Sequence, residues 1–214
     1  MKQQMKSQRS RQLILDAGLK LFSRQGYRAT SMKNIAEVAG ISTGRVYHHF
    51  ANKLQIYTTL IEDYWDKLRD PALKLNQLSA KSRFPEDFQD IVAAIREVVY
   101  ANRESIMLIY IDVIEFRGEH IQRFYRDMAE RFRSVFGERF EALRSEGRLN
   151  PNVDPLFAVM LTYRFFFQYF LVETSFGVKD HLGFSAEEVA AKAEDLVLHG
   201  LLSPQGAAIQ GSEA

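Results

Sequence analysis

Apolar residues recur every three or four positions along almost the whole of this 214-residue chain, and this spacing most constrains its fold. Such spacing gathers apolar side chains on one face of an α-helix, and no segment shows the alternation typical of a β-strand. Glycine and proline fall between the periodic segments. The sequence therefore predicts an all-α protein, with helices near 10–24, 32–39, 43–50, 53–68, 85–99, 104–116, 119–146, 155–176 and 185–202. The stretch 75–85 is predicted to be the least regular.

Two of the predicted helices are short and lie on either side of a glycine. Thr30 and Ser31 can cap the helix at 32–39, and Gly40 permits a sharp turn. Ser42 or Thr43 can cap the following helix, which ends near residue 50. Two short capped helices around a glycine are typical of a helix-turn-helix.

Charge is divided unevenly along the chain. Residues 1–55 carry ten basic and two acidic side chains, a net charge of +8, whereas the remainder carries eighteen basic and twenty-five acidic ones, a net charge of −7. A basic first quarter favours contact with a polyanion, from which the acidic remainder would be repelled. Nucleic acid and an anionic membrane surface both fit this pattern.

The composition argues against several classes of protein. The absence of cysteine excludes disulfides, thiolate zinc sites and cysteine nucleophiles, and it fits the reducing cytoplasm. The basic N-terminus lacks the apolar core of a signal peptide. The apolar run at 155–172 is interrupted by Arg164 and Gln168 and falls short of the roughly 20 residues of a membrane span, so we expect a buried helix and no membrane partner.

Signatures of catalysis and of metal binding are missing from the sequence. His48 and His49 are adjacent, so on a helix they project about 100° apart and are poorly placed to share one metal ion. We find no Glu-x-x-His pair, glycine-rich phosphate loop or Gly-x-Ser-x-Gly motif. We therefore predict no catalytic residues, no metal and no cofactor, and expect that the chain is not an enzyme.

The helix-turn-helix region has a more specific likeness. Its pattern resembles the DNA-binding signature of the tetracycline-repressor (TetR) family at Thr30, Ile35-Ala36, Ala39-Gly40-Ile41-Ser42, Gly44, Tyr47, His49-Phe50 and Lys53. The motif covers about residues 10–55, and beyond them the likeness lies only in the helical layout. With Val46 and Phe50 turned inward on a helix, Gly44 and His48 point outward.

The resemblance implies a role for each exposed residue of this region. Phosphate contacts are implied for Ser42, Tyr47, His48, His49 and Lys53, and approach to base edges for Thr43, Gly44 and Arg45. Arg45 departs from the small residue common at this position and could pair with guanine, contributing about 1–3 kcal/mol of discrimination. Leu54 departs from the usual glutamate. Thr30, Ser31 and Lys33 complete the predicted DNA-binding set.

The rest of the chain suggests a sensor. An aromatic cluster at 163–170 could line a cavity for a hydrophobic effector of unknown identity, such as a fatty acyl or aromatic compound, although such stripes are more often core. The predicted lining residues are Tyr100, Met107, Tyr110, Phe124, Tyr163, Phe166, Phe167 and Phe170. The resemblance further implies that the helices at 155–176 and 185–202 pair with their twins in a homodimer.

The sequence therefore predicts a cytoplasmic transcriptional regulator, with a DNA-binding domain at 1–55, a ligand-sensing and dimerisation domain at 56–204 and a disordered tail at 205–214. We expect a repressor that leaves a palindromic operator in double-stranded DNA when the effector binds. Two alternatives stay open: a basic module on anionic membranes, and a helical enzyme using Tyr110 or Arg164. Neither accounts for Gly40, Gly44 and Lys53 at their spacing.

Overall fold

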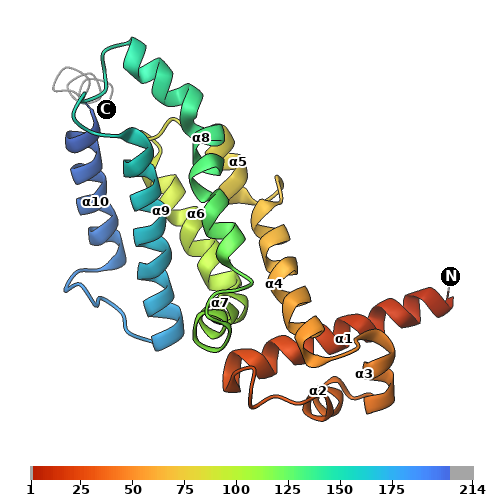
Figure 1. Cartoon of the computed structure of the whole chain (residues 1–214). Coiled ribbons are helices and arrows are strands. Elements are labelled where there is room, and N and C mark those ends of the chain that lie inside the picture. Colours follow the sequence, from red (N-terminus) through yellow and green to blue (C-terminus); the bar gives the residue numbers. More distant parts are fainter. Residues whose placement is uncertain (1, 203–214) are drawn as a thin grey trace. The chain divides into compact units, whose positions relative to one another are not determined.

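The computed structural model describes residues 2–202, and this part of the chain is helical without a β-strand (Figure 1). It contains α1 Lys2–Gln25, α2 Met32–Ala39, α3 Thr43–His49, α4 Lys53–Arg69, α5 Lys74–Ala80, α6 Phe88–Ala101, α7 Arg103–Phe116, α8 Gln122–Ser145, α9 Pro155–Leu171, the π-helical turn η1 Val172–Phe176 and α10 Ala186–Leu201. The all-α prediction is confirmed. The predicted tail at 205–214 lies outside the described residues.

The chain forms two compact units, which are described separately. The first contains the residues up to Arg69 together with Glu104–Phe124, and the second contains Asp70–Arg103 and the chain from Tyr125 onward. This division differs from the predicted boundary between residues 55 and 56. The physical reason is that α4 packs against α1, and α7 contributes side chains to the same core.

In the first unit, α1 packs against α2, α3 and α4. Ile14 and Phe22 of α1 are fully buried, and Gly18 lets α4 approach closely, because a β-carbon there would lie 2.9 Å from Ile56 Cγ2. The predicted start of α1 at Ser10 is eight residues too late. The prediction followed the apolar spacing, whereas residues 3–9 form an exposed helical extension without an apolar face.

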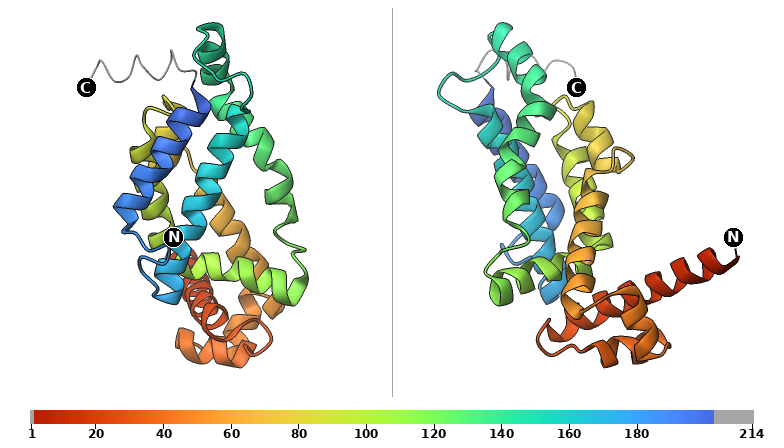
Figure 2. Two further views of the ribbon diagram at one scale, coloured as in Figure 1. Left: turned by 90° about the vertical axis from the view of Figure 1, so that its left-hand side faces the viewer. Right: turned by 45° about the vertical axis from the view of Figure 1, so that its right-hand side comes forward.

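In the second unit, α6 packs against α9, and α10 lies beside both (Figure 2). Phe88 of α6 meets Phe166 of α9 edge to face at 5.8 Å between ring centres, and both side chains are fully buried. The prediction of an irregular stretch at 75–85 missed α5, whose N-cap residue, Leu73, offers no side-chain cap that a sequence could reveal.

The predicted start of α6 at Pro85 is also corrected, to Phe88. The Asp87 carboxylate accepts hydrogen bonds from the backbone N–H of Arg83 and from the Ser82 hydroxyl, so the preceding residues form a turn. The other predicted helices lie within three residues of the observed bounds, if η1 is counted with α9.

The helical segment Pro155–Phe176 is long and apolar enough to span a membrane by length and composition, with 22 residues that include an 18-residue stretch of mean hydropathy 1.4. The prediction that Arg164 and Gln168 leave it too short is therefore corrected. A single such helix is weak evidence for a span, since core helices pass the same test. Phe166 and Phe170 are buried where α9 packs against α6 and α10, but only 39% of the apolar stretch is buried, so this helix has one core face and one exposed face.

Candidate nucleic-acid interface

Local hydrogen bonds set the geometry of α2, the turn and α3. The Ser31 hydroxyl accepts from the backbone N–H of Asn34 at 3.1 Å, and the Asn34 side chain accepts from the backbone N–H of Ser31 at 3.0 Å, forming a capping box. Gly40 has φ +68°, the left-handed conformation that ends α2. The Ser42 hydroxyl then accepts from the backbone N–H of Arg45 at 3.3 Å and begins α3. The predicted helix-turn-helix is thus fixed by neighbouring residues.

Burial divides α3 into an inner and an outer face. Val46, and Phe50 at its C-terminal cap, are buried in the first unit. The outer face carries Gly44, Arg45, Tyr47 and His48 exposed to solvent, with Thr43 and His49 at its margins, half-buried. Ser42, Ser31 and Lys33 are exposed as well. The structure therefore brings together a polar, aromatic and basic surface on one short helix, as its periodicity predicts.

Several basic side chains gather around His49 of α3. The pKa of His49 is lowered, first by burial and then by the charges of His48, Arg45 and Arg11. Arg11 of α1 lies with its guanidinium carbon 5.3 Å from the centre of the Phe50 ring. Arg11 is not part of the predicted DNA-binding set, and no local pattern indicates its place beside Phe50, because that depends on how α1 packs against α3.

Thr30 and Lys53 have internal hydrogen bonds. Thr30 is buried, and its hydroxyl donates to the carbonyl of Gly26 at 2.9 Å. The Lys53 ammonium donates to the carbonyls of Tyr27 and Thr30 at 2.6 and 2.7 Å and lies 4.1 Å from the centre of the Tyr27 ring. Burial lowers its pKa, and the charge of Glu115 acts in the opposite direction. In this structure Lys53 holds the turn between α1 and α2, and the predicted phosphate contact would use its remaining N–H.

Replacing Lys53 by methionine should lower the free energy of unfolding by about 1–3 kcal/mol, because two hydrogen bonds from a charged donor are lost, although the Tyr27 carbonyl keeps the backbone N–H of Thr30 as a donor. Urea denaturation of the full chain measures this change. Lys33→Met is the control. Lys33 is exposed, and its Nζ lies 4.0 Å from Oε1 of the exposed Glu37, which makes a weak ion pair. Its loss should therefore change the free energy of unfolding by about 0.5 kcal/mol or less. Equal effects of the two substitutions would contradict a structural role for Lys53.

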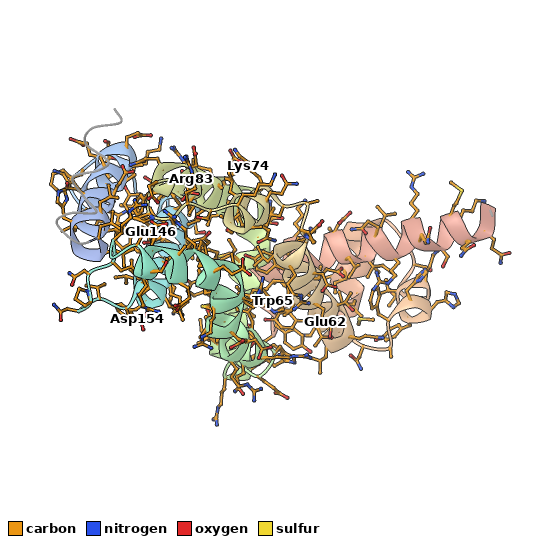
Figure 3. The ribbon with its side chains drawn as sticks, turned by 90° about the horizontal axis from the view of Figure 1, so that it is seen from above. Glu62, Trp65, Lys74, Arg83, Glu146 and Asp154 are labelled. Carbon is orange, nitrogen blue, oxygen red and sulfur yellow. The ribbon has the colours of Figure 1, made fainter. Side chains whose placement is uncertain are left out.

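The residues predicted to line a ligand cavity are divided between the two units. Met107, Tyr110 and Phe124 belong to the first unit, and Tyr100, Tyr163, Phe166, Phe167 and Phe170 to the second. Phe124 stacks on Trp65 of α4, labelled in Figure 3, with 4.0 Å between ring centres.

In the second unit the predicted residues differ in exposure. Phe166 and Phe170 are core residues, whereas Tyr100 is exposed and its hydroxyl donates to Glu173 at 3.1 Å. Tyr163 shares a 2.6 Å hydrogen bond with the Ser79 hydroxyl, and burial raises the pKa of Tyr163 to about 12.

An open groove in the second unit lies elsewhere and contains none of the predicted lining residues. Its walls include Arg133, Phe140 and Arg144 of α8 and the residues 151–156, among them Asp154 (Figure 3). Arg133 and Arg144 pair with Glu130 and Glu141 of their own helix. Within residues 2–202, no three histidine or carboxylate side chains gather in a way that could hold a metal ion.

Comparison with known proteins agrees with this geometry. The pattern of the family described as "Bacterial regulatory proteins, tetR family" matches residues 14–60. The regulator AcrR of Shigella flexneri is 32% identical over 124 residues, which cover 55% of this chain and 55% of AcrR. The transcriptional repressor KstR2 of Rhodococcus jostii (strain RHA1) is 25% identical over 191 residues, covering 89% of this chain and 90% of KstR2.

A solved structure shows the same fold. NalD, the secondary repressor of the MexAB-OprM multidrug efflux pump in Pseudomonas aeruginosa, superposes with a TM-score of 0.62 at 21% identity, over 92% of this chain and 99% of NalD. The relatives are transcriptional regulators and not enzymes.

Proposed function

Because this chain belongs to the TetR family of bacterial regulatory proteins, we propose that it binds a palindromic operator in double-stranded DNA as a homodimer and releases it when a small molecule binds. The observation that carries the proposal is the outer face of α3, where Gly44, Arg45, Tyr47 and His48 lie exposed and Arg11 of α1 lies beside Phe50 at the end of the helix. A short helix of this kind fits the major groove, and Arg45 is the residue that reads a guanine.

An apolar stripe supports the homodimer. On α9, Phe157, Leu161 and Phe165 follow one another at four-residue spacing and are 65%, 54% and 38% exposed, and Leu196 of α10 is 76% exposed. Side chains at this spacing lie on one helix face. Pairing the stripe with the same stripe of a second copy would bury it, and a twofold dimer matches a palindromic operator, whose half-sites lie about 34–36 Å apart.

The response to ligand is inferred from the relatives. KstR2 and NalD are repressors, which supports repression here. The second unit is the effector-binding part of the proposal, and its aromatic helix α9 favours a hydrophobic effector, with no cofactor required. The site of action is the cytoplasm, where chromosomal DNA is accessible.

Selection of bound duplexes from a random-sequence library at physiological salt tests the proposal. We expect the wild-type protein to enrich a short palindrome, and Arg45→Ala to enrich the same palindrome with one guanine position in each half-site relaxed, because about 1–3 kcal/mol of discrimination is lost there. Lys33→Ala removes an exposed cation of α2 and should leave every position as in the wild type. Enrichment of no common sequence by the wild type would refute the proposed function.

A further inference from the structure

Glu115 of α7 is hydrogen-bonded to the turn that leads from α1 into α2. One oxygen of its carboxylate accepts from the backbone N–H of Tyr27 and the other from that of Arg28, each at 2.9 Å. The side chain of Glu115 is 15% exposed, and the Arg28 guanidinium lies 3.7 Å away. Hydrogen bonds from two backbone amides to one partly buried carboxylate are among the stronger contacts that a side chain makes. Lys53 donates hydrogen bonds to two carbonyls of the same turn. The turn is therefore held both through its backbone N–H groups, by Glu115, and through its carbonyls, by Lys53.

Gly26 makes room for this contact. Its φ of +84° is in the left-handed region, and a β-carbon at this position would lie 2.8 Å from the nearer Glu115 oxygen. Any larger residue would push the carboxylate away from the turn. Gly26, directly after α1, and Glu115 in α7 are therefore matched to each other.

Three further contacts join α7 to the rest of the first unit. The Phe116 ring lies 4.7 Å from the Tyr27 ring and 5.0 Å from the Tyr57 ring, measured between centres. The buried hydroxyl of Tyr57 donates to the carbonyl of Leu108 at 2.7 Å. Leu108, Glu115 and Phe116 of α7 thus contact the turn after α1 and α4.

The segment that contains α7 is covalently connected at both of its ends to the second unit. The segment Glu104–Phe124 belongs to the first unit. It is preceded in the chain by α6 and followed by the remainder of α8, and both of these belong to the second unit. A change in the second unit can therefore act on the first through both ends of this segment, in addition to the connection that follows α4.

We propose that Glu115 is the positioning residue through which α7 and the DNA-binding helices move as one body, so that displacement of α7 shifts the turn at Gly26–Thr30 and the start of α2. This inference rests on the proposed function, because it names the link between effector binding and operator release. A coupling of this kind is reciprocal, so operator binding must also stabilise α7. The link can therefore be tested without knowing the effector.

Amide hydrogen exchange of the full-length protein, with and without the selected palindromic duplex, tests the link. In the wild type, the duplex should slow exchange in α3 and also in α7. In Glu115→Gln, the Tyr27 and Arg28 amides of the free protein should exchange about tenfold faster, since an amide group replaces one acceptor oxygen. The duplex should then still protect α3 but protect α7 clearly less than in the wild type, because only the Phe116 and Tyr57 contacts of α7 remain.

Two control variants separate this role from charge and from the ion pair. Glu119→Gln makes the same change of charge at an exposed position, and Arg28→Ala removes the 82%-exposed partner but keeps both backbone hydrogen bonds. Both should behave as the wild type does. If the glutamine variant gives no folded dimer, Glu115→Asp serves in its place, because the shorter side chain cannot reach both amides.

The outcomes are distinguishable. Undiminished protection of α7 by the duplex in the Glu115 variant, or no protection of α7 in the wild type although α3 is protected, would overturn the inference and leave the proposed function standing. A wild-type protein that binds no duplex would overturn both.

Discussion

Gly44→Glu is expected to abolish operator binding while the protein stays folded. Gly44 lies on the outer face of α3, and no heavy atom lies within 4 Å of the place where its β-carbon would be. The new carboxylate would therefore fit on the free protein but would meet phosphates and base edges in the complex, where like charges repel by several kcal/mol. We expect affinity to fall by a factor of about 100 or more, which corresponds to about 2.7 kcal/mol. Fluorescence anisotropy with the selected duplex measures it.

Gly44→Ala is the matched control for this prediction. Alanine favours helix over glycine by about 0.8–1.0 kcal/mol, so this variant should unfold at a higher temperature than the wild type. Its single methyl group should weaken binding far less than the glutamate does. Wild-type affinity in the glutamate variant would show that the outer face of α3 does not approach DNA.

Combining Phe157→Glu with Leu161→Glu should convert the dimer into a monomer and thereby remove operator binding. The two side chains lie one turn apart on the exposed stripe of α9, and two symmetry-related pairs of carboxylates would be buried without partners if the dimer formed. A monomer contacts one half-site only, so we expect the affinity for the full palindrome to fall by a factor of about 1,000, or about 4 kcal/mol. Sedimentation equilibrium and duplex titration measure the two effects.

Val135→Glu provides the corresponding control on α8. Val135 is an exposed apolar residue outside the stripe, and its replacement should leave both the dimer and operator affinity unchanged. A double α9 variant that remains dimeric at micromolar concentration would show that α9 does not form the dimer contact, and the twofold model of operator binding would need another interface.

Features encoded by neighbouring residues could be predicted from the sequence. The start and end of α2 follow from Ser31 and Gly40, and the start of α3 follows from Ser42, so the helix-turn-helix was predicted at the correct positions. The outer face of α3 follows from the helical period once Val46 is placed inside. In these cases the interacting groups are separated by five residues or fewer.

Features that depend on contacts distant in the sequence could not be predicted. Glu115 and Tyr27 are separated by 88 positions, and no local pattern pairs them. The same holds for Arg11 beside Phe50 and for the inclusion of α7 in the first unit. For Lys53, the motif indicated a conventional phosphate contact, whereas the carbonyls that bind its ammonium belong to a turn more than twenty residues earlier.

The most direct test of sequence-specific regulation is the affinity of the full-length protein for the selected palindrome compared with a scrambled duplex of the same composition, at physiological salt. A specific regulator should bind the palindrome at least about 1,000-fold more tightly, with two protomers on each duplex. Equal affinity for the two duplexes would show that the basic N-terminal unit binds DNA through charge alone, and it would contradict the proposed function.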